Sequence, residues 1–342
     1  EFGYIFVSAQ RRRGEMEETM NKLLGTVLTS ALTISLLAGC GTSSSNKKKV
    51  GIIQFMDHTS LNEIKDSFDK EMKTLGYDDK NIEYTFKNGQ GDTNTCASIA
   101  NDFAGKNFDC VMAIATPAAQ AVAKLATKTP VVFSAVTDPV GAQLTSSLTK
   151  PDKNITGTSD EVQVDQIIDK ALEINPNTKT IGMLYNKGEA NSVTNIKKAK
   201  AYCAKKNIKV EEATIASVNE AQSAVNVLNS KCDAIFAPND NTVASAMNVV
   251  SDACKKANKP LYVGADSMVK DGGFLSVGID YKELGKETAK IVDKVLKGNK
   301  VENIPVKVFK TNLKIYVNTT TKDKLGIKLP ENITSDSKYT EI

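Results

Sequence analysis

Two successive parts of this chain carry the same order of short apolar runs and helical patterns. In the first part, apolar runs at 50–55 and 109–115 alternate with stretches such as 61–75, whose apolar residues recur at helical spacing. Similar apolar runs follow in the same order in the second part, at 179–184, 233–238 and 259–263. Because strands that alternate with helices build parallel sheets from βαβ units, the pattern predicts two similar α/β lobes.

The positions of the repeated pattern predict three passages of the chain between the lobes. Lobe 1 is expected to comprise 50–156 and 281–312, lobe 2 to comprise 157–280 and 313–330, and 331–342 to form a polar tail. Three passages make a three-stranded hinge rather than a single linker. The predicted fold class is therefore α/β, with two Rossmann-like lobes that contain parallel sheets and close on each other.

The N-terminus carries the pattern of an export signal. Residues 20–39 combine a basic start, an uncharged apolar stretch and small residues before Cys40, which is typical of a signal peptide. The four residues that end at Cys40 resemble the lipobox of bacterial lipoproteins, in which the peptide is cut before the cysteine and the thiol is acylated. Residues 1–19 are set aside as an upstream segment, and 40–49 is expected to be a polar tether. An uncleaved anchor helix is the alternative.

Charge and residue types exclude several classes of function. A net charge of +4 is too weak to indicate a nucleic-acid partner. The single histidine, His58, excludes a site with several histidine ligands, and Arg13 is the last arginine, so no guanidinium is available for an anion further along. No metalloprotease, serine-hydrolase or phosphate-loop motif occurs, and a hydrolase would have to use His58. We expect no catalytic residue, no cofactor and no metal.

Five motifs occur in order along the chain: Ala115–Ala121, Val136–Gly141, Asn154–Ser159, Pro238–Thr242 and Gly278–Gly285. They closely resemble those of ABC-transporter substrate-binding proteins of the tryptophan/tyrosine type, and the resemblance spans about residues 50–312. It implies a type I periplasmic-binding-protein fold with the ligand in a cleft between the lobes. It also implies delivery of a small ligand, most often an aromatic amino acid, to a membrane permease.

The binding site is predicted from the strand ends, because ligands of open α/β sheets bind outside the carboxyl ends of the strands. Thr116, Ser134 and Thr137 are expected to hold an α-carboxylate with hydroxyls and a helix N-terminus. Asp240, on the opposite lobe, is expected to accept from the α-ammonium, and its alternative role is a helix cap. The candidate ligand-binding residues are Met56, His58, Thr116, Pro117, Ala118, Ser134, Thr137, Asp138, Ser159, Asn186, Asn239, Asp240 and Asp266.

We therefore expect a solute-binding lipoprotein of an ABC importer, held on the extracytoplasmic face of the cell membrane. Its expected partners are an amino-acid ligand, the permease subunits and, through an acylated Cys40, the lipid bilayer; the chain is expected to be a monomer. Two alternatives remain open. The ligand is a branched-chain amino acid or a nucleoside, or the protein is a sensor for a different membrane partner.

Overall fold

The computed structural model describes residues 47–311 and 313–342. The upstream segment, the signal peptide, Cys40 and most of the tether lie outside the described residues. Within the described ranges, no helix combines the length and the apolar character that crossing a membrane requires.

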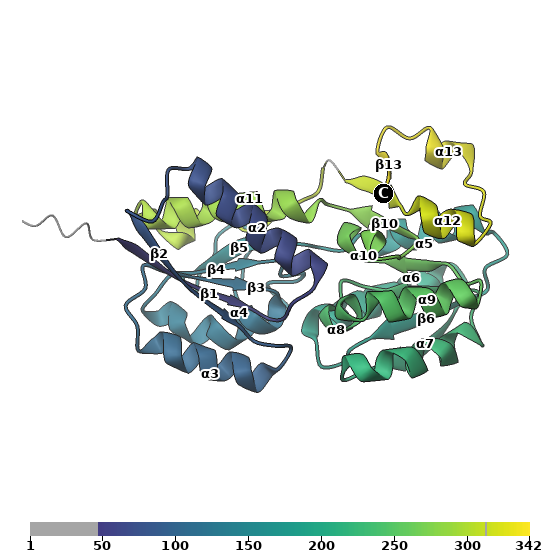
Figure 1. Cartoon of the computed structure of the whole chain (residues 1–342), viewed down its shortest axis with the longest axis horizontal. Coiled ribbons are helices and arrows are strands. Elements are labelled where there is room, and N and C mark those ends of the chain that lie inside the picture. Colours follow the sequence, from purple (N-terminus) through teal and green to yellow (C-terminus); the bar gives the residue numbers. More distant parts are fainter. Residues whose placement is uncertain (1–46, 312) are drawn as a thin grey trace, which may run out of the picture. The chain divides into compact units, whose positions relative to one another are not determined.

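Lobe 1 is built on a six-stranded sheet with the order β11-β5-β4-β3-β1-β2, and all of its strand pairs are parallel. Its strands are β1 (Lys48–Gln54), β2 (Ile82–Asn88), β3 (Cys110–Ile114), β4 (Val131–Ser134), β5 (Ile155–Ser159) and β11 (Lys307–Val308). Its helices are α2 (Thr59–Thr74), α3 (Thr93–Ala104), α4 (Thr116–Val122) and α11 (Tyr281–Leu296). Helices α2 and α11 pack together over one face, and α3 packs with α4 over the other (Figure 1).

Lobe 2 is built on a seven-stranded sheet with the order β13-β12-β10-β9-β8-β6-β7. Its strands are β6 (Thr180–Tyr185), β7 (Lys209–Thr214), β8 (Ala234–Ala237), β9 (Leu261–Val263), β10 (Leu275–Gly278), β12 (Lys314–Val317) and β13 (Tyr339–Glu341). Its helices are α5 (Val164–Ile174), α6 (Ala190–Lys205), α7 (Ala221–Asn229), α8 (Asn241–Ser245), α9 (Met247–Lys256), α10 (Asp266–Lys270), α12 (Thr319–Lys324) and α13 (Glu331–Thr334). The sheet is parallel except where β12 runs antiparallel to β10.

The structure differs from the sequence-based boundaries at two places. Strand β5 continues to Ser159 and pairs with β4 and β11, so residues 157–159 belong to the sheet of lobe 1 rather than to lobe 2. The last segment, 331–342, is more than a polar tail, because β13 pairs with β12 and Ile333 is fully buried. In both places backbone pairing with a neighbouring strand decides the outcome, and that pairing has no local signal in a polar stretch.

Three connections join the lobes. The first follows β5, the second joins β10 to α11, and the third joins β11 to β12. The second returns the chain to lobe 1, where Thr288 of α11 is hydrogen-bonded to Ser134 and Thr158 of the sheet, each at 2.8 Å. This buried hydroxyl cluster helps to fix the position of α11 on the sheet, because buried hydroxyls need hydrogen-bond partners.

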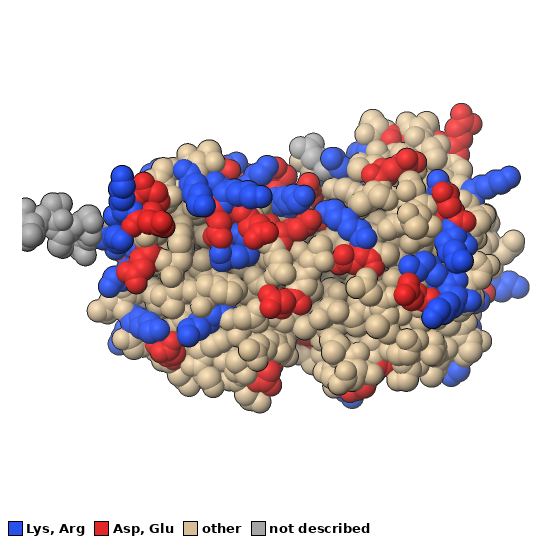
Figure 2. Space-filling view, viewed as in Figure 1, with Lys and Arg blue, Asp and Glu red and all other residues tan. Residues whose placement is uncertain are grey.

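Charged side chains of both signs are interspersed over α2 and α11 on the face shown in Figure 2. Several of them form ion pairs within one helix, such as Lys290 with Glu287 at 2.7 Å. Exposed pairs of this kind contribute only about 0.3–0.5 kcal/mol each. The fold is therefore held mainly by the apolar faces of the strands and helices, such as the fully buried run of β3.

The cysteines of the described residues are all buried and free. Burial raises the pKa of the Cys96 and Cys203 thiols to about 11. They therefore stay protonated at neutral pH, which makes them unreactive packing groups.

We expect a Gly157→Ala substitution in β5 to destabilise the protein strongly. An added Cβ would lie 2.0 Å from the carbonyl oxygen of Phe133, which belongs to the paired strand β4. Such a clash costs about 2–3 kcal/mol and should appear as a lower midpoint in thermal unfolding. The matched control is Gly278→Ala in β10, where an added Cβ meets no described atom within 4 Å. Equal midpoints for the two variants would contradict this account.

Candidate ligand-binding site

A polar cavity lies between the two lobes. The cavity is small, with a volume of about 10 Å³. Its lining residues come from loops and helix starts that follow strands of both sheets. They are His58, Ser60, Leu61, Thr116, Ala135, Thr137, Asp160, Asn191, Asn239, Asn241, Ala244, Met268 and Tyr281. The cavity thus occupies the position that the strand-end rule predicts.

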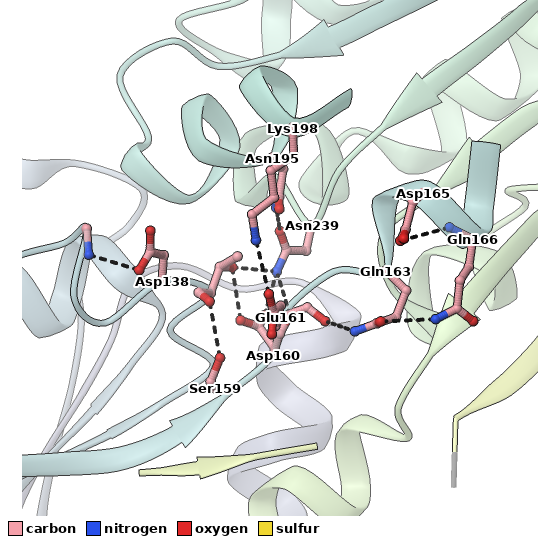
Figure 3. A network of polar contacts seen from close by, with 12 residues as sticks. Asp138, Ser159, Asp160, Glu161, Gln163, Asp165, Gln166, Asn195, Lys198 and Asn239 are labelled. Atoms are coloured by element: carbon pink, nitrogen blue, oxygen red, sulfur yellow. Dashed lines mark hydrogen bonds and ion pairs between the residues drawn. The ribbon is translucent and has the colours of Figure 1, made fainter. Parts of the chain in front are cut away.

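The carboxylate of Asp160 is the centre of the polar network around this cavity (Figure 3). Its Oδ1 accepts a hydrogen bond from the Thr137 hydroxyl at 3.0 Å. Its Oδ2 accepts from Asn239 Nδ2 at 2.6 Å and from the Tyr281 hydroxyl at 2.7 Å. Thr137 belongs to lobe 1, Asn239 to lobe 2, and Tyr281 starts the helix after the second connection. One side chain in the first connection therefore joins both lobes and two parts of the hinge.

Asp160 is buried without a cation. Its hydrogen-bond partners are a threonine hydroxyl, an amide and a tyrosine hydroxyl, and no lysine, arginine or histidine of the described residues forms an ion pair with it. Burial raises the pKa of the Asp160 carboxyl, and the three hydrogen bonds oppose that rise. A buried negative charge without a counter-charge favours the binding of a ligand that brings a positive group.

Three polar atoms of the lining residues are buried and lack any partner among the described residues. They are Nδ1 of His58, Oγ1 of Thr116 and Oδ1 of Asn191. A buried polar group without a partner costs about 1–3 kcal/mol. Unpartnered atoms gathered at one cavity therefore indicate a place where a polar ligand completes the hydrogen bonding.

The backbone adopts unusual angles at two strand ends beside the cavity. Ala115 has a φ of 80° and Ala135, at the end of β4, has a φ of 55°. Residues other than glycine rarely adopt such angles, and the strain is concentrated at functional sites. Both residues stand at strand ends beside the cavity.

Direct contacts across the cavity hold the lobes together. His58 Nε2 lies 3.1 Å from Asn241 Oδ1, and Ser60 Oγ lies 2.5 Å from Ser267 Oγ. Beside them, Lys270 of lobe 2 forms an ion pair with Glu63 of α2 at 3.0 Å. These contacts, with the small free volume of the cavity, describe a closed arrangement.

Four of the sequence-predicted residues line the cavity. They are His58, Thr116, Thr137 and Asn239. His58 is the N-cap residue of α2, and burial lowers the pKa of its imidazole to about 4, so the ring is neutral at physiological pH.

Asp240 is not among the lining residues, and its contacts match the alternative role of a helix cap. It is fully buried in lobe 2, where Oδ1 accepts from the Val243 amide at 2.8 Å. Oδ2 accepts from the Asn186 amide and from the Ser192 hydroxyl, each at 2.6 Å. Every contact comes from within lobe 2, so the side chain links β6, α6 and α8.

The other predicted residues do not line the cavity. Ser134 and Ser159 direct their hydroxyls to Thr288 and to the Thr137 carbonyl, respectively. Asp138 accepts from the Gly141 amide at 2.9 Å, which closes a turn. The remaining residues outside the lining are Met56, Pro117, Ala118, Asn186 and Asp266. Asp266 forms an ion pair with Lys270 at 2.8 Å, and burial raises the pKa of its carboxyl to about 6.

Sequence reasoning missed Asp160 and Tyr281, although both positions carry a signal. Asp160 follows Ser159, the last residue of one family-like motif, and Tyr281 lies inside another. The expected boundary at residue 157 assigned Asp160 to lobe 2, whereas it directly follows β5 in the first connection. Asn191 was also missed, because a single polar residue at a helix start is usually a cap. Asn241 lies in the Pro238–Thr242 motif at the predicted cleft but was not among the predicted ligand-binding residues.

The fold and the cavity are typical of hinged, two-lobed proteins that bind a small molecule between two sheets. A family model described as "ABC transporter substrate binding protein" matches residues 49–340. The chain therefore belongs to the ABC transporter substrate-binding protein family, whose members are extracytoplasmic. Its fold is the type I periplasmic-binding-protein fold.

Three similar proteins show what this chain resembles. The tyrosine-binding protein of Clostridioides difficile (strain R20291) is 33% identical over 299 residues, covering 83% of this chain and 87% of that protein. A solved ABC domain from Streptococcus pneumonia in complex with L-Trp is 38% identical, with a TM-score of 0.83, covering 87% of this chain and 100% of that chain. A ligand-free, open substrate-binding protein with adhesive properties from Clostridium difficile is 35% identical, with a TM-score of 0.65, covering 86% and 99%.

The TM-score is higher for the L-Trp complex than for the ligand-free, open structure, although identity and coverage are similar. This difference agrees with the hydrogen bonds that join the two lobes of the present structure.

We expect Asp240→Ala to destabilise lobe 2. The substitution leaves the Asn186 and Val243 amides and the Ser192 hydroxyl without their buried acceptor. The free energy of unfolding, measured by urea denaturation, should fall by about 2–4 kcal/mol. Asp138→Ala, which removes one hydrogen bond from an exposed turn, should cost about 1 kcal/mol or less. An Asp240→Ala protein as stable as the parent would show that the carboxylate has no structural role.

Proposed function

We propose that this protein binds an aromatic amino acid in the cavity between its lobes and delivers it to the permease of an ABC importer. The proposal rests mainly on the buried carboxylate of Asp160, which lines the cavity and has no counter-charge among the described residues. Two similar proteins support the ligand class, since one is named as tyrosine-binding and the other was solved with L-Trp.

In this proposal the ligand's α-ammonium binds to Asp160. A charge-assisted hydrogen bond between a cation and a buried carboxylate is about twice as strong as a neutral one. The ammonium supplies the positive charge that the cavity lacks. The proposed acceptor for the ammonium is thus Asp160 instead of Asp240, but it is still a buried carboxylate.

The α-carboxylate binds on the lobe 1 side, where Thr116 provides a buried hydroxyl without a partner among the residues described. This assignment retains the prediction that hydroxyls replace the missing arginine. Thr137 contributes indirectly, because its hydroxyl already donates to Asp160.

Binding at Asp160 is coupled to closure of the lobes. The carboxylate accepts from Asn239 of lobe 2 only when the lobes are closed, and from Tyr281 at the second connection. A ligand that neutralises this carboxylate stabilises the closed arrangement more than the open one, which shifts the population toward closure.

Calorimetry with Trp, Tyr and Phe tests the proposed function. We expect at least one of them to bind, and Asp160→Asn to weaken that binding about 100-fold, because the variant removes the charge but keeps the shape of the side chain. Asp138→Asn, at a carboxylate outside the cavity lining, should change the affinity less than threefold. Failure of all three amino acids to bind, or unchanged affinity in Asp160→Asn, would reject the proposal.

We also propose that Cys40 is acylated and holds the protein at the membrane. The support is the sequence pattern before Cys40, since this residue lies outside the described structure. Metabolic labelling with a radioactive fatty acid should label the full-length chain, and Cys40→Ala should abolish the label. Cys96→Ala, at a buried thiol, should retain it. A label that persists in Cys40→Ala would contradict the anchor.

A further inference from the structure

The single histidine of the chain bridges the two lobes at the cavity. His58 follows β1 in lobe 1, and its Nε2 lies 3.1 Å from Oδ1 of Asn241, the first residue of α8 in lobe 2. The other ring nitrogen, Nδ1, is buried and has no partner in the described ranges. The two nitrogens therefore differ in their surroundings, and a neutral ring carries its proton on only one of them.

The neighbours of Asn241 determine which nitrogen carries the proton. Its Nδ2 donates to Glu189 Oε2 at 2.5 Å, so its Oδ1 is the atom that faces His58. Glu189 Oε2 also accepts from the Asn241 amide, and Oε1 accepts from the amide and the hydroxyl of Thr242. While Glu189 is ionised, both of its oxygens are acceptors, so the Asn241 amide group cannot be reversed without losing a hydrogen bond.

It follows that His58 donates from Nε2 and keeps a lone pair on Nδ1. An amide oxygen accepts but cannot donate, so the contact with Asn241 requires the proton on Nε2. The lone pair of Nδ1 is a desolvated acceptor on a residue that lines the cavity. It requires a donor from whatever fills the cavity, and it repels a carboxylate.

An amino acid offers two kinds of donor to such an atom. The proposed function, on which this inference rests, assigns the α-ammonium to Asp160, whose charge makes it the stronger partner. Because the α-ammonium has three N–H groups, the donor for the imidazole nitrogen comes either from the ammonium or from the ligand's side chain, and only the second source differs between amino acids. Among aromatic amino acids, tryptophan carries an indole N–H and tyrosine a phenol O–H, whereas phenylalanine carries neither.

We propose that Nδ1 of His58 accepts a hydrogen bond from the ligand's side chain and so selects aromatic amino acids that carry an N–H or O–H donor. The chain Glu189–Asn241–His58 fixes the acceptor, and because it crosses from lobe 2 to lobe 1, the acceptor is fixed only when the lobes are closed. In the closed protein the site then distinguishes tyrosine from phenylalanine by one hydrogen bond.

Paired ligands that differ in one donor test this selectivity. Tyr should bind at least tenfold more tightly than Phe, and Trp at least tenfold more tightly than 3-benzothienylalanine, in which sulfur replaces the indole N–H. His58→Gln should reduce these ratios to within about threefold, because its amide can still reach Asn241 but leaves no acceptor at the position of Nδ1. His58→Asn, whose amide oxygen can take the place of Nδ1, should retain part of the selectivity.

The imidazole can also be observed directly, because one histidine gives one set of ring signals. With ¹⁵N-labelled histidine, NMR should show a neutral ring protonated at Nε2 in the protein bound to Tyr. The Nδ1 signal should differ between the Tyr and Phe complexes, as expected for an acceptor that gains a hydrogen bond. A ring protonated at Nδ1 would overturn the inference.

The outcomes separate this inference from the proposed function. Equal affinities for Tyr and Phe in the parent protein, or ratios unchanged in His58→Gln, would overturn the role of His58 while leaving aromatic amino-acid binding intact. Ratios that instead vanish in Asn191→Leu and persist in His58→Gln would assign the acceptor to the other unpartnered lining atom, Asn191 Oδ1, and overturn the inference as well. Failure of every aromatic amino acid to bind would reject both.

Discussion

The hydrogen bonds to one buried carboxylate connect the parts of this protein. Asp160 accepts from Thr137 of lobe 1, Asn239 of lobe 2 and Tyr281 at the second connection. A charge buried without a cation is unfavourable by itself, so the structure around it must supply directed donors. Those donors come from both lobes only when the lobes are closed. The same carboxylate therefore orders the hinge and leaves a charge for a ligand to neutralise.

Two buried aspartates have different roles because they lie at different places in the fold. Asp240 has all of its contacts within lobe 2 and caps the start of α8, so it stabilises one lobe regardless of closure. Asp160 has contacts on both sides of the cavity, so its energy depends on how the lobes are arranged. A carboxylate whose contacts span a moving interface can couple binding to closure, whereas one confined to a rigid lobe cannot.

Much of the fold could be predicted from the chain because it depends on local patterns. Buried runs such as Cys110–Ile114 must be covered on both faces, and their alternation with helical stretches predicts parallel sheets. Of the lining residues, His58, Thr116, Thr137 and Asn239 were predicted from the strand-end rule. Asp160 was not found, because an aspartate beside a strand end is locally indistinguishable from a turn or cap residue.

The two-lobed α/β architecture, the family motifs and the lack of any arginine after Arg13 can be read from the sequence, since composition and periodicity are properties of the chain alone. Which aspartate faces the cavity, and which nitrogen of His58 has no partner, depend on the tertiary structure. The reason is physical: the charge state and hydrogen-bonding role of a buried polar group depend on partners distant in sequence. For His58 that partner is Asn241, on the opposite lobe.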